Sequence, residues 1–178
     1  GMPCGGKMEV YVEPFLPQPE LMLVGQGRIA ELVAELGRLL HFRVTVNSPG
    51  ATREDFPFAD QLITDDTDYQ KINPGLNSYV IVLTQHKGDQ QVIQAALRGT
   101  PRYIGLVAST KRSRLVVEYL KEGGMDADAL RQVLRAPCGL DLGGRTPEEI
   151  ALSIITEVVK LRHERTGLSM MEVKQCSI

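Results

Sequence analysis

The chain has 178 residues, of which 43% are hydrophobic and 24% charged, values that are typical of one globular domain and exclude a disordered or fibrous protein. Twenty Lys and Arg stand against twenty-two Asp and Glu, so the net charge of −2 provides no overall positive field, and we expect no general nucleic-acid binding. Apolar runs fall well short of the roughly 20 residues that span a bilayer, and no signal peptide is recognisable, so we expect a cytoplasmic protein without a membrane partner.

The first residues predict one strand apart from the rest. Met8, Val10 and Val12 alternate with more polar residues, which is typical of a half-buried strand. Ahead of them, Cys4 is followed by two glycines in a loop that we expect to be accessible. It is either a reactive thiol or sulfur ligand, or an incidental terminal cysteine. We therefore expect residues 1–19 to form an N-terminal segment with a short extra strand.

From residue 20 onward, predicted strands alternate with predicted helices. The first strand is a continuous apolar run that ends at Gly25, as in a strand buried on both faces. The helices are indicated by apolar residues that recur every three or four positions. Strands are predicted over residues 21–24, 43–46, 61–64, 79–84 and 103–107, and helices over 28–40, 89–98, 111–121 and 127–134.

A final long helix has the clearest start signal in the chain. Thr146 is a typical N-cap, Pro147 suits the first helical position, and Glu149 completes a capping box; the apolar period continues to about Arg162. This alternation predicts an α/β fold, a Rossmann-like three-layer doubly wound parallel sheet, over residues 20–166. Residues 167–178 have no sustained period and predict a loosely ordered tail.

A glycine-rich turn joins the first predicted strand to the first helix. Gly25, Gln26, Gly27 and Arg28 begin a G-x-G-x-x-A pattern that ends at Ala30, in the context that the dinucleotide fingerprint requires. The first glycine allows a tight turn, the second lets a phosphate approach the backbone, and the free N–H groups of the helix start attract an anion. The turn therefore predicts a phosphate or nucleotide site, with a purely structural turn as the alternative.

The end of the second strand is the usual position of the ribose-reading carboxylate, and here it is Asn47. An amide can still bond to a hydroxyl, but it lacks the charge. This favours a 2′-phosphorylated, differently shaped or absent nucleotide over ordinary NAD, unless Asn47 is simply a turn residue.

The loop after the fourth strand should face the glycine turn, because ligands of open parallel sheets bind beyond the carboxyl ends of the strands. Thr84 supplies a hydroxyl, His86 an imidazole and Lys87 a cation. His86 is interpreted as a proton donor or a hydrogen-bonding residue rather than a metal ligand, because no second His or Cys lies nearby in sequence.

A basic stretch follows the fifth strand. If Ser109 caps the next helix, then Lys111, Arg112 and Arg114 lie in its first turn, where the helix dipole disfavours cations. The stretch predicts an anion here, either a ligand phosphate or an acidic partner surface, with a solvated basic face as the alternative.

Nucleophilic catalysis and metal binding are not expected. His41, His86 and His163 are far apart in sequence, and no Ser or Cys lies in a nucleophile elbow. The three cysteines fit neither a disulfide framework nor a zinc site. Cys138 follows no predicted strand and is interpreted as a small packed residue.

Several of these segments together resemble the XdhC/CoxI family of accessory proteins for molybdenum hydroxylases. The most specific is the long stretch from Pro137 to Ala151, which a shared fold alone does not explain. Where the family tends to have an Asp-Pro-Arg turn, this chain has Asn47-Ser48-Pro49-Gly50. The matching stretches are residues 4–6, 10–14, 23–27, 103–109 and 137–151.

The resemblance implies a Rossmann-like C-terminal domain that binds molybdenum cofactor (molybdopterin), or a nucleotide, and assists its sulfuration or insertion into a xanthine dehydrogenase or carbon monoxide dehydrogenase type enzyme. The implied partners are the molybdenum hydroxylase apoenzyme, a separate protein with the N-terminal XdhC/CoxI domain, a cysteine desulfurase and a second copy in a homodimer. The implied binding residues are Gly25, Gln26, Gly27, Arg28, Asn47, Thr84, His86, Ser109, Lys111 and Arg112, with Cys4 as a thiol. The alternative is a small NAD(P)-dependent oxidoreductase, although a chain of this length leaves little room for a substrate region.

Overall fold

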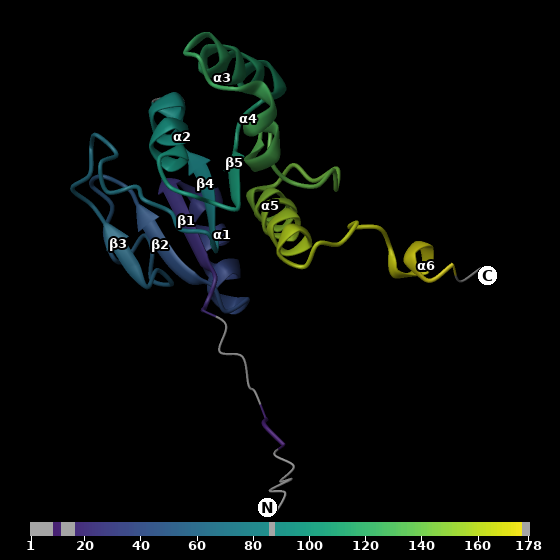
Figure 1. Cartoon of the computed structure of the whole chain (residues 1–178). Helices are drawn as coiled ribbons and strands as arrows, with labels where there is room; N and C mark the ends of the chain where they lie inside the picture. The colour runs from purple at the N-terminus through teal and green to yellow at the C-terminus, as the bar shows by residue number, and fades with distance from the viewer. Residues whose placement is uncertain (1–8, 12–16, 86–87, 176–178) are drawn as a thin grey trace, which may run out of the picture.

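Six parallel strands form one sheet in the computed structural model, which describes residues 9–11, 17–85 and 88–175 (Figure 1). The strand order is β3-β2-β1-β4-β5-β6, so the direction of winding reverses between β1 and β4, as in a Rossmann sheet. This confirms the predicted fold class. The strands are β1 (Glu20–Gly25), β2 (Arg43–Asn47), β3 (Gln61–Ile63), β4 (Ser78–Leu83), β5 (Tyr103–Leu106) and β6 (Leu134–Arg135).

Helices cover both faces of the sheet, because β1 and β4 are apolar on both faces. Leu21 and Leu23 of β1 pack into a core with α1 and α5, whereas Met22 and Val24 pack into a second core with α2, α3 and α4. The helices are α1 (Arg28–Leu39), α2 (Asp89–Leu97), α3 (Thr110–Glu122), α4 (Ala127–Val133), α5 (Pro147–Arg162) and the single turn α6 (Met170–Val173). No helix in the described part of the chain is long and apolar enough to cross a bilayer.

The predicted strands and helices from β1 to α5 agree with the observed ones to within one residue at each end. The sequence did not predict β6, since two residues are too few to show a period. Leu134, expected to be the last residue of a helix, instead pairs with Ile104 of β5. The short strand is defined by its parallel pairing with the edge of β5.

The predicted N-terminal strand is wrong for the residues that the structure describes. Of its residues the structure describes Glu9, Val10 and Tyr11, which are not in a strand and are exposed, Val10 to 70%. Alternation of polar and apolar residues favours a strand, but a strand also needs a neighbouring strand with which to pair. These three residues pair with no strand in the described part of the chain. The remainder of the predicted strand, and Cys4, lie outside the described residues.

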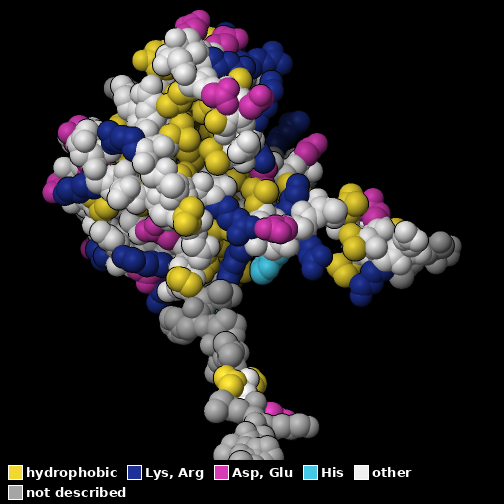
Figure 2. Space-filling model, in the orientation of Figure 1, with side chains coloured by type: hydrophobic (Ala, Val, Ile, Leu, Met, Phe, Trp, Pro, Cys, Tyr) yellow, Lys and Arg dark blue, Asp and Glu magenta, His cyan; other side chains and the backbone are white. Residues whose placement is uncertain are grey.

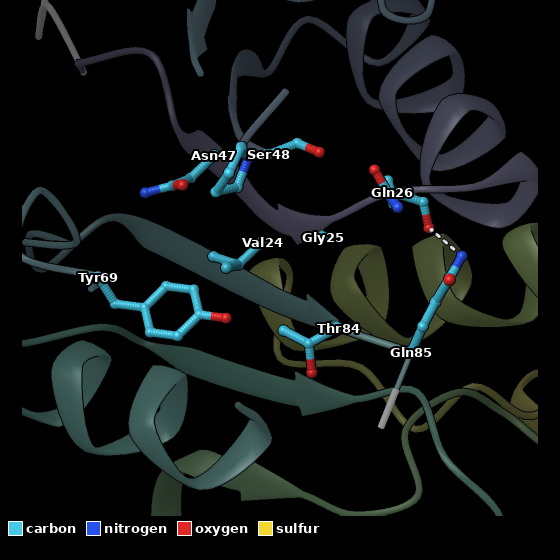
Figure 3. Close-up of a pocket in the computed structure, with 9 residues that line it drawn as sticks. Val24, Gly25, Gln26, Asn47, Ser48, Tyr69, Thr84 and Gln85 are labelled. Carbon is cyan, nitrogen blue, oxygen red and sulfur yellow. Dashed lines mark hydrogen bonds between the residues drawn. The ribbon is translucent and has the colours of Figure 1, made fainter. Parts of the chain in front are cut away.

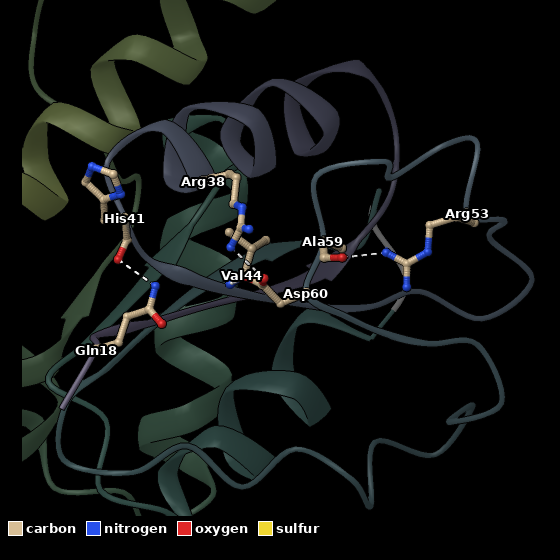
Figure 4. Close-up of polar contacts among 7 residues, drawn as sticks. All are labelled: Gln18, Arg38, His41, Val44, Arg53, Ala59 and Asp60. Atoms are coloured by element: carbon tan, nitrogen blue, oxygen red, sulfur yellow. Dashed lines mark hydrogen bonds and ion pairs between the residues drawn. The ribbon is translucent and has the colours of Figure 1, made fainter.

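Three hydrogen bonds secure the β3 edge of the sheet (Figure 4). Asp60, just before β3, accepts hydrogen bonds from Arg38 Nη1 of α1 at 2.6 Å and from the backbone N–H of Val44 in β2 at 2.8 Å. Arg53 Nη1 donates to the carbonyl oxygen of Ala59. One carboxylate thus links α1, β2 and β3, although β3 itself is only three residues long.

The C-terminal residues leave the body of the domain as an arm that carries α6 (Figure 1), a turn that the sequence did not predict. Ser169 and Glu172 form a capping box around it. Hydrophobic side chains gather on the arm (Figure 2), and Leu168, Met170, Met171 and Val173 are each at least half exposed.

The capping box of α5 provides a stability test. Thr146 Oγ1 accepts from the N–H of Glu149, whose carboxylate accepts from the N–H of Thr146. Because α5 packs against α1 in the core, we expect Thr146→Ala to lower the free energy of unfolding by about 1 kcal/mol in urea titrations. Ser169→Ala removes the equivalent cap from α6, which buries no residue, and is the control that should leave global stability unchanged. Equal losses in the two variants would contradict this account.

Candidate functional site

A crevice opens beyond the carboxyl ends of β1, β2 and β4, where the strand order reverses (Figure 3). Its volume is about 370 Å³, within the usual range for small-molecule sites. Open parallel sheets bind their ligands at this position. The crevice is lined by Val24, Gly25, Gln26, Asn47, Ser48, Pro49, Tyr69, Thr84 and Gln85.

The glycine turn forms one end of the crevice, at the start of α1. Gly25 has φ +130°, and a Cβ on it would lie 2.2 Å from the carbonyl oxygen of Leu83. Gly27 has φ +100°, and its Cβ would lie 3.0 Å from Gln85 Nε2. Among the described residues no side chain caps α1, so with respect to them the N–H groups of its first turn stay available to an anion. The neighbouring cation, Arg28, is exposed and forms ion pairs with Glu31 and Glu148.

Asn47 has mainly a structural role here, which is one of the two alternatives that the sequence left open. Its side chain is 1% exposed, and Nδ2 donates to Asp66 Oδ2 at 2.5 Å. Asp66, also buried, accepts from the backbone N–H groups of Gln70 and Lys71 at 2.8 and 3.1 Å. Oδ1 of Asn47 has no partner among the described residues. The pair of side chains therefore ties the end of β2 to the loop between β3 and β4.

That loop presents Tyr69 to the crevice, a residue that sequence reasoning missed. Tyr69 has φ +59°, its side chain is half-buried, and its carbonyl oxygen accepts from Arg98 Nη2 at 3.2 Å. Burial and the carboxylates of Asp89 and Asp66 raise the pKa of its phenol. No periodicity marks a lone aromatic residue in a polar loop, so only the folded chain shows where it lies.

Thr84 and Arg112 meet at a buried carboxylate at the start of α2. Thr84 Oγ1 donates to Asp89 Oδ1, and Arg112 donates to Asp89 Oδ2 through Nε at 2.6 Å and Nη2 at 2.5 Å. The side chains of Asp89 and Arg112 are only 3% and 17% exposed. Burial raises the pKa of Asp89, against the hydrogen bond from Thr84, and lowers the pKa of Arg112.

This ion pair corrects part of the sequence interpretation. The anion beside Arg112 is a carboxylate of the same chain, Asp89, rather than a ligand phosphate or a partner. Ser109 does cap α3, since its Oγ accepts from the N–H of Arg112 at 3.3 Å. Lys111 and Arg114 are exposed, as expected of a solvated basic face.

The predicted site residues are divided among separate places. Gly25, Gln26, Asn47 and Thr84 line the crevice, and Gln26 and Gly27 line an adjoining cleft of about 260 Å³. Ser109, Lys111 and Arg112 line a different cleft of about 360 Å³ between α2 and α3. His86 and Lys87 lie outside the described residues. Among the residues that the structure does describe, no group of three or more His, Cys, Asp and Glu could hold a metal ion.

Cys138 is packed against the core beside α5, as the sequence indicated, but it does follow a strand, β6. Its backbone N–H donates to the carbonyl oxygen of Leu106 at 3.0 Å. The nearby carboxylate of Glu157 accepts from Tyr103 Oη at 2.6 Å and from the N–H of Gly139 at 2.8 Å. Burial and the charge of Glu157 raise the pKa of the Cys138 thiol to about 12.

The Asp89–Arg112 pair predicts a large stability loss when one partner is removed. We expect Arg112→Met to lower the free energy of unfolding at pH 7 by about 3 kcal/mol, because Asp89 is left buried and unpaired. The exposed control, Arg114→Met, should cost less than about 0.5 kcal/mol. Without Arg112, the pKa of Asp89 in the folded state rises further above its unfolded value. The loss should therefore shrink as the pH falls and Asp89 is protonated. Equal losses for the two variants, or a loss independent of pH, would show that the pair is not the cause.

Cys138 should react slowly with alkylating reagents in the folded protein. In a chain with Cys4 and Cys176 replaced by Ser, we expect iodoacetamide at pH 8 to alkylate the folded protein about a thousandfold more slowly than the urea-unfolded protein, because so little thiolate is present. Glu157→Gln removes the neighbouring negative charge and should accelerate the reaction. Rapid alkylation of the folded parent would refute the raised pKa.

Comparison with known proteins identifies the family. Residues 21–158 match the model of the XdhC Rossmann domain. The protein named "Uncharacterized protein YqeB" of Escherichia coli is 27% identical over 180 residues, which cover 97% of this chain and 32% of that protein. A protein of Bacillus subtilis whose name describes a probable xanthine dehydrogenase subunit is 29% identical over 163 residues, which cover 86% of this chain and 46% of that protein.

A solved structure is also similar to this chain. The crystal structure of a xanthine dehydrogenase from Bacillus halodurans superposes with a TM-score of 0.71 at 26% identity, over 88% of this chain and 46% of the other. The chain thus spans less than half the length of each of these relatives. Because the family model covers the fold from β1 into the last turn of α5, the chain belongs to the family of the XdhC Rossmann domain.

Proposed function

We propose that this chain binds molybdenum cofactor, or a nucleotide, at the crevice and acts as a maturation factor that assists sulfuration or insertion of the cofactor into an enzyme of the xanthine dehydrogenase or carbon monoxide dehydrogenase type. Two relatives carry the words xanthine dehydrogenase in their names, which supports such an enzyme as the partner. The observation that carries the proposal is the uncapped start of α1 after Gly25 and Gly27.

The residues present fit a ligand with a phosphate. Molybdopterin ends in a phosphate, and the N–H groups at the start of α1 provide hydrogen-bond donors and a positive dipole end for it. The backbone can approach that phosphate closely because position 27 has no Cβ. The described residues that line the crevice include no Lys or Arg, so among them the helix start and the nearby Arg28 supply the positive potential. When bound, the cofactor supplies the molybdenum centre of the target enzyme; the role of this chain is to hold it.

Sulfuration requires a thiol other than Cys138. A nucleophilic sulfur must be a thiolate, and a pKa of about 12 keeps Cys138 protonated at neutral pH. The sulfur would come from Cys4 or from a partner cysteine desulfurase. The remaining expected partners, a protein with the N-terminal XdhC/CoxI domain and a second copy of the chain, belong to the same proposal.

The alternative function, a small NAD(P)-dependent oxidoreductase, would use the same phosphate site. The two functions differ in their chemistry, since an oxidoreductase transfers hydride whereas a maturation factor delivers its ligand unchanged. Micromolar binding of a nicotinamide nucleotide together with hydride transfer to a carbonyl compound would replace the proposal with this alternative.

The experiment is calorimetry with released molybdenum cofactor, NAD, NADH, NADP and NADPH, on the parent chain and on Gly27→Val. A side chain at this left-handed position is strained and fills the space that a phosphate would occupy. We therefore expect binding to weaken at least about tenfold, since several helix-start hydrogen bonds are lost. Gly124→Val is the matched control, because Gly124 also has a positive φ (+88°) but lies between α3 and α4. Equal affinity in the two folded variants would exclude the glycine turn as the site.

A further inference from the structure

We infer that Tyr69 positions the planar ring of the crevice ligand, and that this ligand is a heteroaromatic compound with a single phosphate arm. For the phosphate end of the ligand, the inference depends on the proposed function. For the ring end, three observations support it: the backbone conformation of Tyr69, the space around its phenol and the charges near it.

The backbone at Tyr69 is held in an unfavourable conformation. A φ of +59° lies in the left-handed region, which is uncommon for a bulky residue and costs free energy. The conformation persists because its neighbours are anchored: Asp66 accepts the N–H groups of Gln70 and Lys71, and Arg98 Nη2 donates to the carbonyl oxygen of Tyr69. Asp66 is in turn fixed by Asn47 at the end of β2. These contacts aim one side chain at the crevice.

The phenol reaches the crevice through a space kept free by a glycine. A Cβ on Gly88 would lie 2.5 Å from Tyr69 Oη, so any other residue at position 88 would displace the ring. The hydroxyl points between Val24 and Thr84 into the crevice (Figure 3). It forms no hydrogen bond with a described residue, and burial with the nearby Asp89 and Asp66 raises the pKa of the phenol. The hydroxyl is therefore a neutral donor without a partner among the described residues, on a ring that lines the crevice.

The charges distinguish the two ends of the crevice. At the glycine turn, the start of α1 favours an anion. Beside Tyr69 lie the buried carboxylates of Asp66 and Asp89, and only Asp89 is neutralised by an arginine. The nearby Lys71 is paired with Asp65. Of the described charged groups at this end, Arg98 is bound to the carbonyl oxygen of Tyr69 and Asp66 has no cationic partner, so a second phosphate would lie near an unneutralised carboxylate. An uncharged ring can stack on the tyrosine face, and a polar group beside that ring can accept a hydrogen bond from the hydroxyl.

This arrangement selects a ligand class. Nucleoside monophosphates and pterin phosphates fit, because each joins a flat nitrogen heterocycle to one phosphate arm. A nucleotide with an additional 2′-phosphate is disfavoured, so of the alternatives that Asn47 left open in the sequence we favour a differently shaped ligand.

The experiment measures ring binding and phosphate binding separately. Calorimetry is run with inorganic phosphate, adenosine, pterin, adenosine 5′-monophosphate, adenosine 2′,5′-bisphosphate and released molybdenum cofactor. The variants are Tyr69→Phe, Tyr69→Asn and the control Tyr119→Asn, which replaces an exposed tyrosine of α3. Asn is chosen because it tolerates the left-handed conformation and so preserves the loop.

We expect Tyr69→Asn to weaken every ring-bearing probe by about 5- to 100-fold, the usual contribution of one aromatic stacking partner, and to leave phosphate binding unchanged. Tyr69→Phe keeps the stacking face and should lose less than about tenfold, the effect of one neutral hydrogen bond. The control should match the parent. Adenosine 2′,5′-bisphosphate should bind the parent more weakly than the monophosphate does.

Fluorescence gives a second readout that does not depend on the Asn variant. The chain has no Trp, so its emission comes from tyrosine. A ring that stacks on Tyr69 should quench part of this emission in the parent and in Tyr119→Asn, but not in Tyr69→Phe.

The outcomes test two separate claims, the role of Tyr69 in binding the ring and the role of the glycine turn in binding the phosphate. Phosphate binding with no ring-dependent gain, or equal ring affinity in the parent and Tyr69→Asn, overturns the role of Tyr69 and leaves the proposed phosphate site standing. Ring binding that Tyr69→Asn abolishes, with no affinity for phosphate in the parent, supports Tyr69 and removes the glycine turn from the proposed function. Failure of all probes to bind overturns both claims.

Discussion

The close approach of β1 to β4 at Gly25 is the constraint on which the site depends. Gly25 is paired in register with Leu83, and no side chain fits between the two backbones at that point. The chain can therefore turn sharply at the end of β1 and begin α1 with its N–H groups directed over the sheet edge. A larger residue would move α1 away from β4, and the crevice, the helix start and the contact between Gln26 and Gln85 would be lost together.

Two buried aspartates then secure the loops around this turn. Asp66 joins the end of β2 to the loop that carries Tyr69, and Asp89 joins the end of β4 to α3. Each carboxylate accepts hydrogen bonds from three donor groups, which offsets the cost of burying its charge. The crevice is thus a rigid polar site, although most of its residues lie in loops.

A second buried cluster surrounds Cys138. Glu157 accepts hydrogen bonds from Tyr103 Oη of β5 and from the N–H of Gly139, and burial together with the charge of Glu157 raises the pKa of the Cys138 thiol. Burial and a structural carboxylate therefore keep this cysteine protonated.

The sequence by itself determined the strands and helices from β1 to α4, the glycine turn, and α5 with its cap, because each depends on neighbouring residues. It did not determine the two-residue β6 or the single turn α6. Gly25 and Gly27 are readable from spacing, and Thr146 with Glu149 from a four-residue motif. Only the tertiary structure decided that Arg112 is paired with Asp89, that Asn47 is turned toward Asp66 and that Tyr69 occupies the crevice. Those contacts join residues roughly 20 positions apart or depend on a left-handed backbone. Hydrophobic periodicity predicts neither such distant contacts nor a left-handed residue. It shows which face of a strand or helix is apolar, and not which loop residues meet at the edge of a sheet.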